Sequence, residues 1–450
     1  MLKPVPLAGF LLLTLLPFAL QAKVTPQEAA ALGQSLTPVG AEKAGNPEGT
    51  IPAWTPGKQR GKLSGEFLSD PQIDAERPLF TITKANMAQY AERLSEGHKK
   101  LLDLHDSYKL DVYPGHRLAA MPAAIYNATR ANATSCELKA ADEIDNCTLG
   151  FPFPIPKSGA EPIWNHKLRW RGDAVLRYNN QMIVQPNGKY QLTKIIEDVQ
   201  FIYGSVKKPG TVRDNQGDYL KYLVRTIAPP RVAGTTILVH EKAGAAGDSR
   251  AAWIYSPTLK RIRRAPTVCC DNPAEGTDGN QFYDQVDMFN GTLERYNWKL
   301  VGKREMYVAY NSNRIASPKV KYADLARPRH LNQDLARYEL HRVWVVDAEL
   351  KPGSTHTFRK RRFYLDEDGW NILMIDNYDN RGQLYQFQEG HNQFGYNILA
   401  SSAVPEVIYH FTSGRYFITA MFNEDRPYNF TITYKPDYFT AASVQKSVTR

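Results

Sequence analysis

Few side chains in this sequence fall at spacings that support catalysis. His240-Glu241 begins like the zinc-binding HExxH helix, but Gly244 stands where the second histidine is needed. The sequence also lacks a GxSxG nucleophile turn, a GxxxxGK phosphate loop and a strand-linked GxGxxG. The ten histidines are scattered, and structural roles suit them better. We therefore expect no enzymatic activity, no cofactor and no metal site.

One acidic segment, residues 269–289, has the composition of a calcium loop, because carboxylate oxygens are suitable ligands for Ca²⁺. These oxygens do not alternate along the chain before a glycine, as they do in an EF-hand loop. We therefore expect an ordinary hydrogen-bonded loop. Its acidic residues are Asp271, Glu275, Asp278, Asp284 and Asp287.

The four cysteines suit an oxidising compartment. Cys136 and Cys147 are separated by a short polar segment, and we expect them to form a disulfide. Cys269 and Cys270 are adjacent, so three states stay open: a strained vicinal disulfide, two free thiols, or two metal-binding thiolates. Metal binding is the weakest of the three, because CxxC spacing and a nearby histidine are both missing.

The first residues have the pattern of a secretory signal peptide. Lys3 precedes an apolar run at 7–20, and Ala22 follows it. The run is shorter than the roughly 20 residues that span a membrane. We expect cleavage after Ala22 and export of the mature chain to the periplasm. Because no cysteine lies near the cleavage site, we do not expect a lipoprotein anchor.

Net charge and compartment limit the classes of molecule that this protein can bind. The formal net charge of +10 would suggest nucleic acid in the cytosol. An exported protein meets phospholipid headgroups, lipopolysaccharide and acidic ligands instead, and a basic surface with no partner is the alternative. The 25 Tyr, 18 Phe and 7 Trp, with many Val, Ile and Thr, favour sheet over helix.

The chain divides into four parts. The signal peptide at 1–22 is followed by an extended arm at 23–82, which is rich in Pro, Gly and Thr. Residues 83–170 form a helical region that contains the disulfide. Residues 171–450 hold successive strands joined by short turns such as DEDG and DNRG, and then a C-terminal tail. This last part predicts a twisted, curled antiparallel meander.

Three helices are expected before the strands begin. The first is a short helix at 25–34, with Pro26 at its first position. Apolar residues at helical spacing predict a second at 83–105, with Thr83 as its cap. The third is expected at 126–141.

Several strands carry bulky residues at both parities, as in RVWVVDAEL and FYLDEDGWNILMI, whereas a surface strand alternates. We expect helices to cover one face and either a hydrophobic ligand or a solid aromatic core to cover the other. Same-face residues of the most apolar strands are the candidates to line a cavity. They are Trp253, Tyr255, Trp344, Val346, Phe363, Leu365, Leu373 and Ile375.

The stretch WIYSPTLKRIRRAP, residues 253–266, predicts a hairpin with aromatic residues beside a strongly basic return strand. Such cations suit contact with anionic headgroups, or with a protein partner, at the rim of the cavity. They are Lys260, Arg261, Arg263 and Arg264.

Four stretches resemble a bacterial family, domain of unknown function 1329 (DUF1329): LTPVGAEKAGNPEGTIPAW, RPLFTITKANMAQYAERLSEG, FPFPIPKSGAEPIWNH and ERYNWKLVGKREMYV. The resemblance covers essentially the whole mature chain. The family is similar in turn to the Lol-type carriers of outer-membrane lipoproteins, which fold as an incomplete antiparallel barrel closed by helices around acyl chains. That likeness covers only about residues 170–415, and the arm, the disulfide region and the tail have no counterpart.

The resemblance implies a fold that is mainly β with α: a large curled antiparallel sheet, an incomplete LolA-like barrel, covered by helices and preceded by the arm. It implies a periplasmic, non-enzymatic carrier of a lipid or another hydrophobic molecule, working beside a resistance-nodulation-type exporter and an outer-membrane protein. Phospholipid is one ligand class, with terpenoid, sterol-like and acyl compounds as rivals. The alternative is an accessory interaction protein that packs its sheet solid and docks on an exporter.

Overall fold

The computed structural model describes residues 24–63, 70–212, 214, 217–243 and 249–448. The expected signal peptide at 1–22 lies outside these residues. Among the helices of the described part, none combines the length and the apolar character that crossing a bilayer requires.

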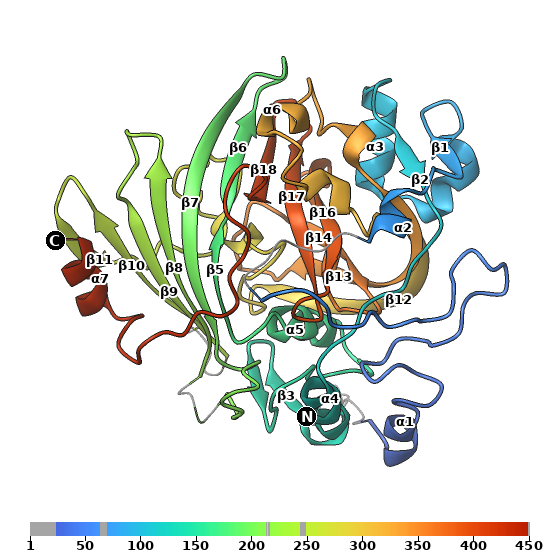
Figure 1. Ribbon diagram of the computed structural model, residues 1–450, viewed down its shortest axis with the longest axis horizontal. Helices are drawn as coiled ribbons and strands as arrows, with labels where there is room; N and C mark the ends of the chain where they lie inside the picture. The colour runs from blue at the N-terminus through green and yellow to red at the C-terminus, as the bar shows by residue number, and fades with distance from the viewer. Residues whose placement is uncertain (1–23, 64–69, 213, 215–216, 244–248, 449–450) are drawn as a thin grey trace, which may run out of the picture.

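One curled, almost entirely antiparallel sheet of sixteen strands dominates the molecule (Figure 1). Its strands are β1 (Phe80–Ile82), β2 (Leu110–Val112), β5 (Ala174–Tyr178), β6 (Asn180–Val184), β7 (Tyr190–Phe201), β8 (Asp218–Ala228), β9 (Thr236–Lys242), β10 (Arg250–Ser256), β11 (Arg261–Arg264), β12 (Tyr296–Ala309), β13 (Tyr338–Leu350), β14 (Lys360–Asp366), β15 (Ile372–Tyr378), β16 (Leu384–Gly395), β17 (Ala400–His410) and β18 (Tyr416–Met421). A separate hairpin joins β3 (Glu137–Ala140) to β4 (Glu143–Asp145).

The strand order is β1-β2-β13-β14-β15-β16-β17-β18-β6-β7-β8-β9-β10-β11, with β12 paired to β13 and β5 paired to β7. Within the described residues the two ends of this path do not pair with each other, so the sheet is open. The expected fold class, a large curled sheet covered by helices, is confirmed.

The helices are short and lie around the sheet. The α-helices are α1 (Pro26–Ala30), α2 (Pro71–Asp74), α3 (Glu96–Leu104), α4 (Ala123–Ser135), α5 (Ala160–Leu168), α6 (Tyr322–Leu325) and α7 (Ala441–Val448). The 3₁₀ helices are η1 (Met87–Arg93), η3 (Tyr283–Gln285), η4 (Asn313–Ala316) and η5 (Gln333–Leu335).

Local turn chemistry places the first strands. The turn at 186–188 ends in Gly188, whose positive φ suits glycine, and it joins β6 to β7. β5 and β6 pair with the same side of β7, so they act as one interrupted strand. The basic hairpin also forms as predicted, with Trp253 of β10 directly opposite Arg264 of β11.

The expected helix at 83–105 is wrong as a single element. Leu94 has an extended backbone between η1 and α3, because Ser95 begins a new helix by accepting the His98 N–H in its side chain. Thr83 does not cap a helix, since its own N–H donates to Asn86 Oδ1.

The other two expected helices also end earlier than predicted. α1 covers only part of 25–34, although Thr25 does cap it with a capping box. α4 ends at Ser135, because Cys136 is extended and leads into β3. Cys136 is bonded to Cys147, which confirms the expected disulfide and ties the end of α4 to the segment after β4.

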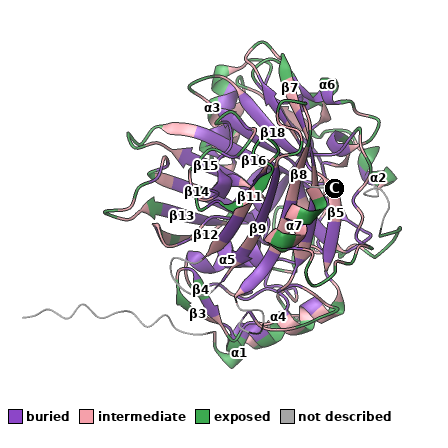
Figure 2. Ribbon diagram, turned by 90° about the vertical axis from the view of Figure 1, so that its left-hand side faces the viewer, coloured by how far each residue is buried: buried purple, intermediate pink, exposed green. Residues whose placement is uncertain are grey.

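The strands β13–β15 are buried on both faces, as their bulky residues predicted. On the inner face, Trp164 of α5 belongs to the same core cluster as Phe363 of β14. On the outer face, Leu101 of α3 belongs to the cluster of Tyr364. Figure 2 shows buried residues concentrated in these strands, with exposed residues on loops and on α1 and α7.

The C-terminal tail covers the outer face of the opposite part of the sheet. Phe439 and Val444, the latter on α7, pack with Leu238 of β9 and Trp253 of β10. α7 also reaches the last strand, where the Ile262 N–H donates to a side chain of this helix.

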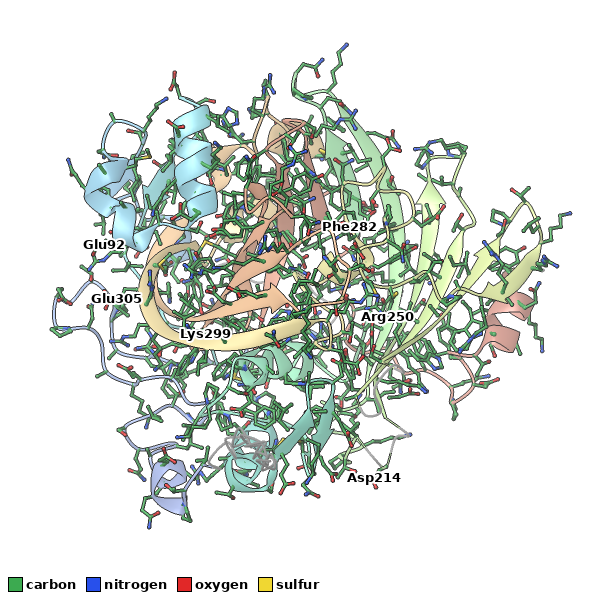
Figure 3. All side chains as sticks on the ribbon, turned by 180° about the vertical axis from the view of Figure 1, so that it is seen from behind. Glu92, Asp214, Arg250, Phe282, Lys299 and Glu305 are labelled. Atoms are coloured by element: carbon green, nitrogen blue, oxygen red, sulfur yellow. A yellow bond between two sulfur atoms is a disulfide. The ribbon has the colours of Figure 1, made fainter. Side chains whose placement is uncertain are left out.

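The long connection from β11 to β12, residues 265–295, lies across the inner face, and we call it the covering loop. Its Asp284 accepts a hydrogen bond from Arg361 of β14 at 2.7 Å, and its Gln285 donates to Gln388 of β16 at 2.9 Å. Figure 3 shows Phe282, on this loop, between the part of the sheet that ends in β11 and the part that contains β12–β16. The acidic segment is therefore part of a hydrogen-bonded loop that spans the hollow side of the sheet.

Candidate functional site

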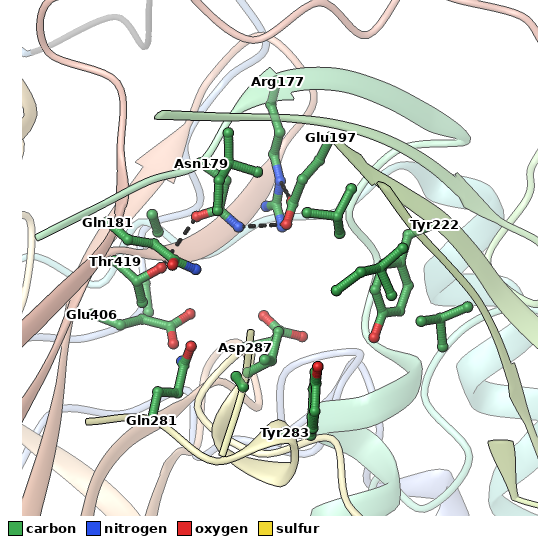
Figure 4. A pocket seen from close by; sticks show the side chains of 18 of the residues that line it. Arg177, Asn179, Gln181, Glu197, Tyr222, Gln281, Tyr283, Asp287, Glu406 and Thr419 are labelled. Carbon is green, nitrogen blue, oxygen red and sulfur yellow. Dashed lines mark hydrogen bonds and ion pairs between the residues drawn. The ribbon is translucent and has the colours of Figure 1, made fainter. Parts of the chain in front are cut away.

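A cavity lies between the inner face of β5–β9, the covering loop and the strands β17 and β18 (Figure 4). About 80 Å³ of it is open to the centres of water molecules. Since one water needs about 10–15 Å³ by this measure, the cavity holds roughly six groups of that size. The cavity has room for a small polar head group and a few carbon atoms. It is too small for a whole two-chain lipid.

One wall of the cavity is apolar. Tyr222 and Val224 of β8 lie directly opposite Val239 and Ile237 of β9, so the four share the inner face. Tyr222 and Val224 keep part of their surface exposed, unlike residues of a packed core. The covering loop closes this wall with the side chains of Val268, Ala274 and Val286.

The opposite end is polar, and its first ion pair uses both oxygens of Glu197. Arg177 Nε donates to Glu197 Oε2 at 2.8 Å, and Asn179 Nδ2 donates to Glu197 Oε1 at 2.7 Å. The Thr419 hydroxyl donates to Asn179 Oδ1 at 3.4 Å. Burial opposes the charge on Arg177, but Glu197 outweighs it and raises the pKa of the guanidinium. Arg177 therefore stays charged and forms an ion pair with Glu197.

A second set of charges joins the covering loop to the segment after α5. Arg169 and Arg171 each form an ion pair with Asp287. Burial would raise the pKa of Asp287, but the two guanidinium groups outweigh burial and lower that pKa. Asp287 is therefore a carboxylate at neutral pH, held by both arginines.

Glu406 of β17 differs from the other acids of the polar end. Among the described residues no cation forms an ion pair with it, and its Oε2 accepts the Met288 N–H at 2.9 Å. Burial and the negative charge of Asp287 raise the pKa of Glu406 to about 8. At pH 7 the side chain is mostly an uncharged acid, which donates a hydrogen bond as well as accepting one.

Two glutamines complete the polar end. Gln181 of β6 and Gln281 of the covering loop point into the space between the strands and the loop in Figure 4. The buried Oε1 of Gln181 has no hydrogen-bond partner within the described structure. An unpaired buried amide oxygen costs free energy, so a bound group that donates to it would be stabilising.

The eight residues expected to line a cavity lie elsewhere. Five belong to the solid part of the sheet: Val346, Phe363, Leu365 and Ile375 are in the inner core cluster, and Leu373 is in the outer one. Trp344 packs against the inner cluster and stacks on Trp370, with ring centroids 6.2 Å apart. None of the eight lines the cavity described above. Their role in ligand binding stays a prediction.

A β-bulge explains one of these placements. Leu373 and Ile375 were expected to share a face, and that expectation is wrong. The pairing of β14 with β15 shifts between Tyr364 and Leu365, so that Leu365 faces Ile372. The extra residue reverses the side-chain parity along β15 and turns Leu373 to the outer face.

Trp253 and Tyr255 lie on β10, where Trp253 faces the C-terminal tail. Arg264 lies over the Trp253 ring at 4.8 Å, in a cation–π contact on the outer face. Arg263 is opposite Ile254, a residue that packs with the apolar wall of the cavity. The expected cations Lys260, Arg261, Arg263 and Arg264 are all exposed.

Two further clusters have the residue types of a chemical site. His341, Asp366 and Asp368 place donor atoms within 4.8 Å of one another. Both Asp368 oxygens accept hydrogen bonds from Arg117, at 2.8 and 2.7 Å, and Tyr310 donates to Asp366 at 2.9 Å. We read this cluster as a buried ion network that supports the fold.

The second cluster is the adjacent pair Cys269 and Cys270, on the covering loop. Their sulfur atoms lie 2.6 Å apart. The hydrogen bond from Cys270 and the charge of Arg250 outweigh burial and lower the pKa of Cys269 to about 6. Cys269, which is partly exposed, therefore has the acidity of a reactive thiol.

An open, curled sheet whose inner face and covering loop enclose an amphiphilic cavity defines the structural class of this protein. The chain belongs to the family described as "Protein of unknown function (DUF1329)", whose model matches residues 81–445. It is also 42% identical over 448 residues to an uncharacterized protein of Pseudomonas aeruginosa, which covers 98% of each chain. The expected family is confirmed.

Three solved structures are similar to parts of the chain. A putative outer membrane lipoprotein-sorting protein domain from Vibrio parahaemolyticus is 16% identical, with a TM-score of 0.44, covering 64% of this chain and 98% of that one. A DUF1329 family protein from Desulfovibrio piger is 13% identical, with a TM-score of 0.42, covering 61% and 92%. A LolA superfamily protein from Nitrosomonas europaea is 13% identical, with a TM-score of 0.36, covering 61% and 93%. At this level of similarity, nothing about a ligand follows.

Proposed function

We propose that this protein is a non-enzymatic carrier that holds a lipid or another hydrophobic molecule in the cavity beneath the covering loop. The observation that carries the proposal is the division of the cavity into an apolar wall on β8 and β9 and a polar end on β5–β7, β17 and the loop. Ligand sites combine mostly apolar walls with a few placed polar groups in this way. Empty voids in protein interiors are apolar on all sides.

We place the carrier in the periplasm. The signal-peptide pattern of residues 1–22 and the disulfide between Cys136 and Cys147 support an oxidising compartment. A molecule with an apolar body cannot cross that aqueous space alone, so a covered cavity would shield it between the two membranes. A resistance-nodulation-type exporter and an outer-membrane protein are the partners that we expect at either end.

The basic hairpin supports contact with an anionic membrane surface. Arg261 and Arg263 alternate on β11 and share the inner face with Ile254, which packs beside the apolar wall. Exposed cations near an anionic leaflet contribute about 1 kcal/mol each. Docking through this hairpin would bring the apolar wall close to the membrane that supplies or receives the cargo.

Native mass spectrometry and lipid extraction after gentle periplasmic purification test the proposal. We expect a copurifying hydrophobic molecule in stoichiometric amount, which the cavity-filling variant Val224→Trp loses. Val346→Trp, in the packed part of the sheet, is the matched control. If nothing copurifies and no hydrophobic probe binds, the accessory interaction protein becomes the better explanation.

A further inference from the structure

We propose that a second cavity, on the outer face of the sheet, binds a phosphate group and that an anionic phospholipid supplies it. The cavity lies between the C-terminal end of α3, the turn at 411–415 that joins β17 to β18, and Arg329. About 170 Å³ of it is open to the centres of water molecules. At about 10–15 Å³ for one water, this is room for a phosphate and several further atoms. The site is separate from the cavity beneath the covering loop, so the inference goes beyond the proposed carrier.

The charge of this cavity is positive and unbalanced. Arg329 and Arg415 both line it, and within the described residues neither forms an ion pair. Among the described residues of the lining, none is acidic, whereas several carboxyl groups line the cavity beneath the covering loop. Burial, and then the positive charges of His330 and Arg329, lower the pKa of His105 in the same lining. The C-terminal end of α3 carries about half a negative charge, which two guanidinium groups outweigh. The cavity therefore attracts an anion.

The backbone holds Arg329 against the turn at 411–415. Its φ of 72° lies in the left-handed region, which residues other than glycine rarely adopt. At Gly414, whose φ is also positive, an added Cβ would lie only 2.3 Å from Arg329 Nη1, so the guanidinium lies directly over this glycine. Strained residues cluster at ligand sites, where the surrounding structure fixes a functional group. Here the fixed group is a charge with no acidic partner in the described structure.

The hydrogen-bonding groups of the cavity are mostly donors, as a phosphate requires. Tyr409 is 2% exposed, and its hydroxyl proton has no acceptor within the described structure. The exposed hydroxyls of Thr412 and Ser413 lie at the same lining. Arginine donates charge-assisted hydrogen bonds to phosphate, often two at a time. Two guanidinium groups and three hydroxyls suit the several oxygens of a phosphate better than the two of a carboxylate.

The place of the cavity in the sheet points to a membrane as the source of the phosphate. From β17 to β11 every neighbouring pair in the strand order is antiparallel, so four turns lie at one end of the sheet. These are the turns at 411–415, 185–189, 229–235 and 257–260. Each contains one cation and no acid, and the cations are Arg415, Lys189, Arg231 and Lys260. This end of the molecule is therefore suited to an anionic leaflet.

An apolar edge of the cavity separates a lipid from free phosphate. Leu104, the last residue of α3, lines the cavity and is 46% exposed, and Phe411 lines it as well. The glycerol and first acyl carbons of a phospholipid would cover Leu104, whereas inorganic phosphate would leave it in water. Covering apolar surface of this kind is favourable, so a lipid should bind more tightly than the bare anion.

Calorimetric titration of the mature protein in a phosphate-free buffer tests the inference. The ligands are inorganic phosphate and dihexanoylphosphatidylglycerol, a short-chain lipid used below its micelle concentration. We expect the lipid to bind at least about tenfold more tightly than phosphate, because it also covers Leu104. Arg329→Gln together with Arg415→Gln should weaken both ligands at least about tenfold, since each variant removes charged hydrogen bonds to the phosphate.

A matched control separates this site from general electrostatics. Lys207→Gln with Lys208→Gln removes the same charge from the connection between β7 and β8, at the opposite end of the sheet, and should leave both affinities unchanged. Equal losses in the two double variants would overturn the assignment of the site. So would a failure of both ligands to bind the unmodified protein.

Two single variants identify the source of the phosphate and separate the site from the proposed carrier. Leu104→Ser should weaken the lipid and leave inorganic phosphate unchanged, and an unchanged lipid affinity would overturn the lipid as the source. Val224→Trp fills the cavity beneath the covering loop, so it should abolish binding of a hydrophobic probe there and keep the affinity for the short-chain lipid. Loss of the lipid in Val224→Trp would place the lipid in that cavity and overturn the second site.

Discussion

The backbone N–H of Met288 donates to the carboxyl of Glu406 at 2.9 Å, and this hydrogen bond fastens the covering loop to β17 across the cavity. Other contacts of the loop involve ionised groups, such as Asp287 with Arg169, or neutral amides, such as Gln285 with Gln388. The carboxyl group of Glu406 is mostly protonated at pH 7. The attachment of the loop and the stability of the fold therefore respond to pH through this residue.

Glu406→Gln should stabilise the protein progressively as pH rises from 5 to 8. The folded state raises the pKa of Glu406 from 4.5 to about 8, so between these values the folded state binds the proton more tightly than the unfolded state. Raising the pH through this window therefore costs stability, which glutamine avoids while it still accepts the Met288 N–H. We expect a difference on the order of 3 kcal/mol at pH 7. Urea unfolding of both proteins at several pH values measures it, and a pH-independent difference would contradict the assignment.

Two valine-to-tryptophan variants should separate the cavity from the packed core. Val224→Trp places its ring in the cavity, so it should abolish binding of an environment-sensitive lipid probe at little cost in stability. Val346 is fully buried in the inner core, and its replacement should overpack the sheet and cost about 1–3 kcal/mol. Probe titration and thermal unfolding give both readouts. The reverse pattern would move the binding site to the strands β13–β15.

Arg261→Glu together with Arg263→Glu should weaken binding to vesicles that contain phosphatidylglycerol by at least about tenfold, because each cation near an anionic surface contributes about 1 kcal/mol. Added salt should reproduce the loss, since these residues are exposed and their attraction is screened. Lys207→Glu with Lys208→Glu, on the exposed connection between β7 and β8, is a control with the same change of charge. Equal losses in both double variants would point to net charge alone.

The reduced protein should carry one unusually acidic thiol. Alkylation of Cys269 should reach half of its maximal rate near pH 6, because the hydrogen bond from Cys270 lowers the pKa of Cys269. Cys270→Gly removes the donor, and glycine suits the positive φ of 62° at this position. The midpoint of the rate profile should then move toward the ordinary value of about 8.5. A midpoint that is the same in both proteins would show that Cys270 does not act on Cys269.

The strands and hairpins could be predicted because their signals are local. The glycine-containing turn before Lys189 and the alternation of apolar residues specify the β6–β7 pair without reference to the rest of the chain. Bulky residues at both parities of β13 correctly indicated cover on both faces, by α5 and the covering loop inside and by α3 outside.

Two elements gave no such signal. α5 was not expected, because all nine of its residues are buried and an amphipathic stripe is therefore absent. β17 also lacks a clear strand signal in the sequence, since Pro405 in its middle argues against an inner strand. The strand accommodates Pro405 near a register shift, between Gly390 and Asn392, where the pairing with β16 is interrupted.

The sequence predicts a cavity on the most apolar strands, whereas the structure has its cavity against β5–β9. Strands such as β13 and β14 are apolar because α5 and Phe289 pack on them. A cavity wall is partly wet, so its strands mix polar and apolar residues on one face, as Glu197 and Tyr222 do. The sequence of β7 and β8 carries this mixture, but which segment covers the face depends on contacts between residues far apart in the chain.

The way in which α7 meets β11 has a consequence for behaviour at high concentration. Gln445 accepts the Ile262 N–H at 2.8 Å and donates to the Lys260 carbonyl at 3.3 Å, so its side-chain amide occupies positions that a neighbouring strand would otherwise take. Open sheet edges are templates for intermolecular strand addition, and both capping and positive charge suppress it. The C-terminal helix therefore blocks the addition of a strand from another molecule at this edge. A chain truncated before Ala441 should form oligomers that grow through β11.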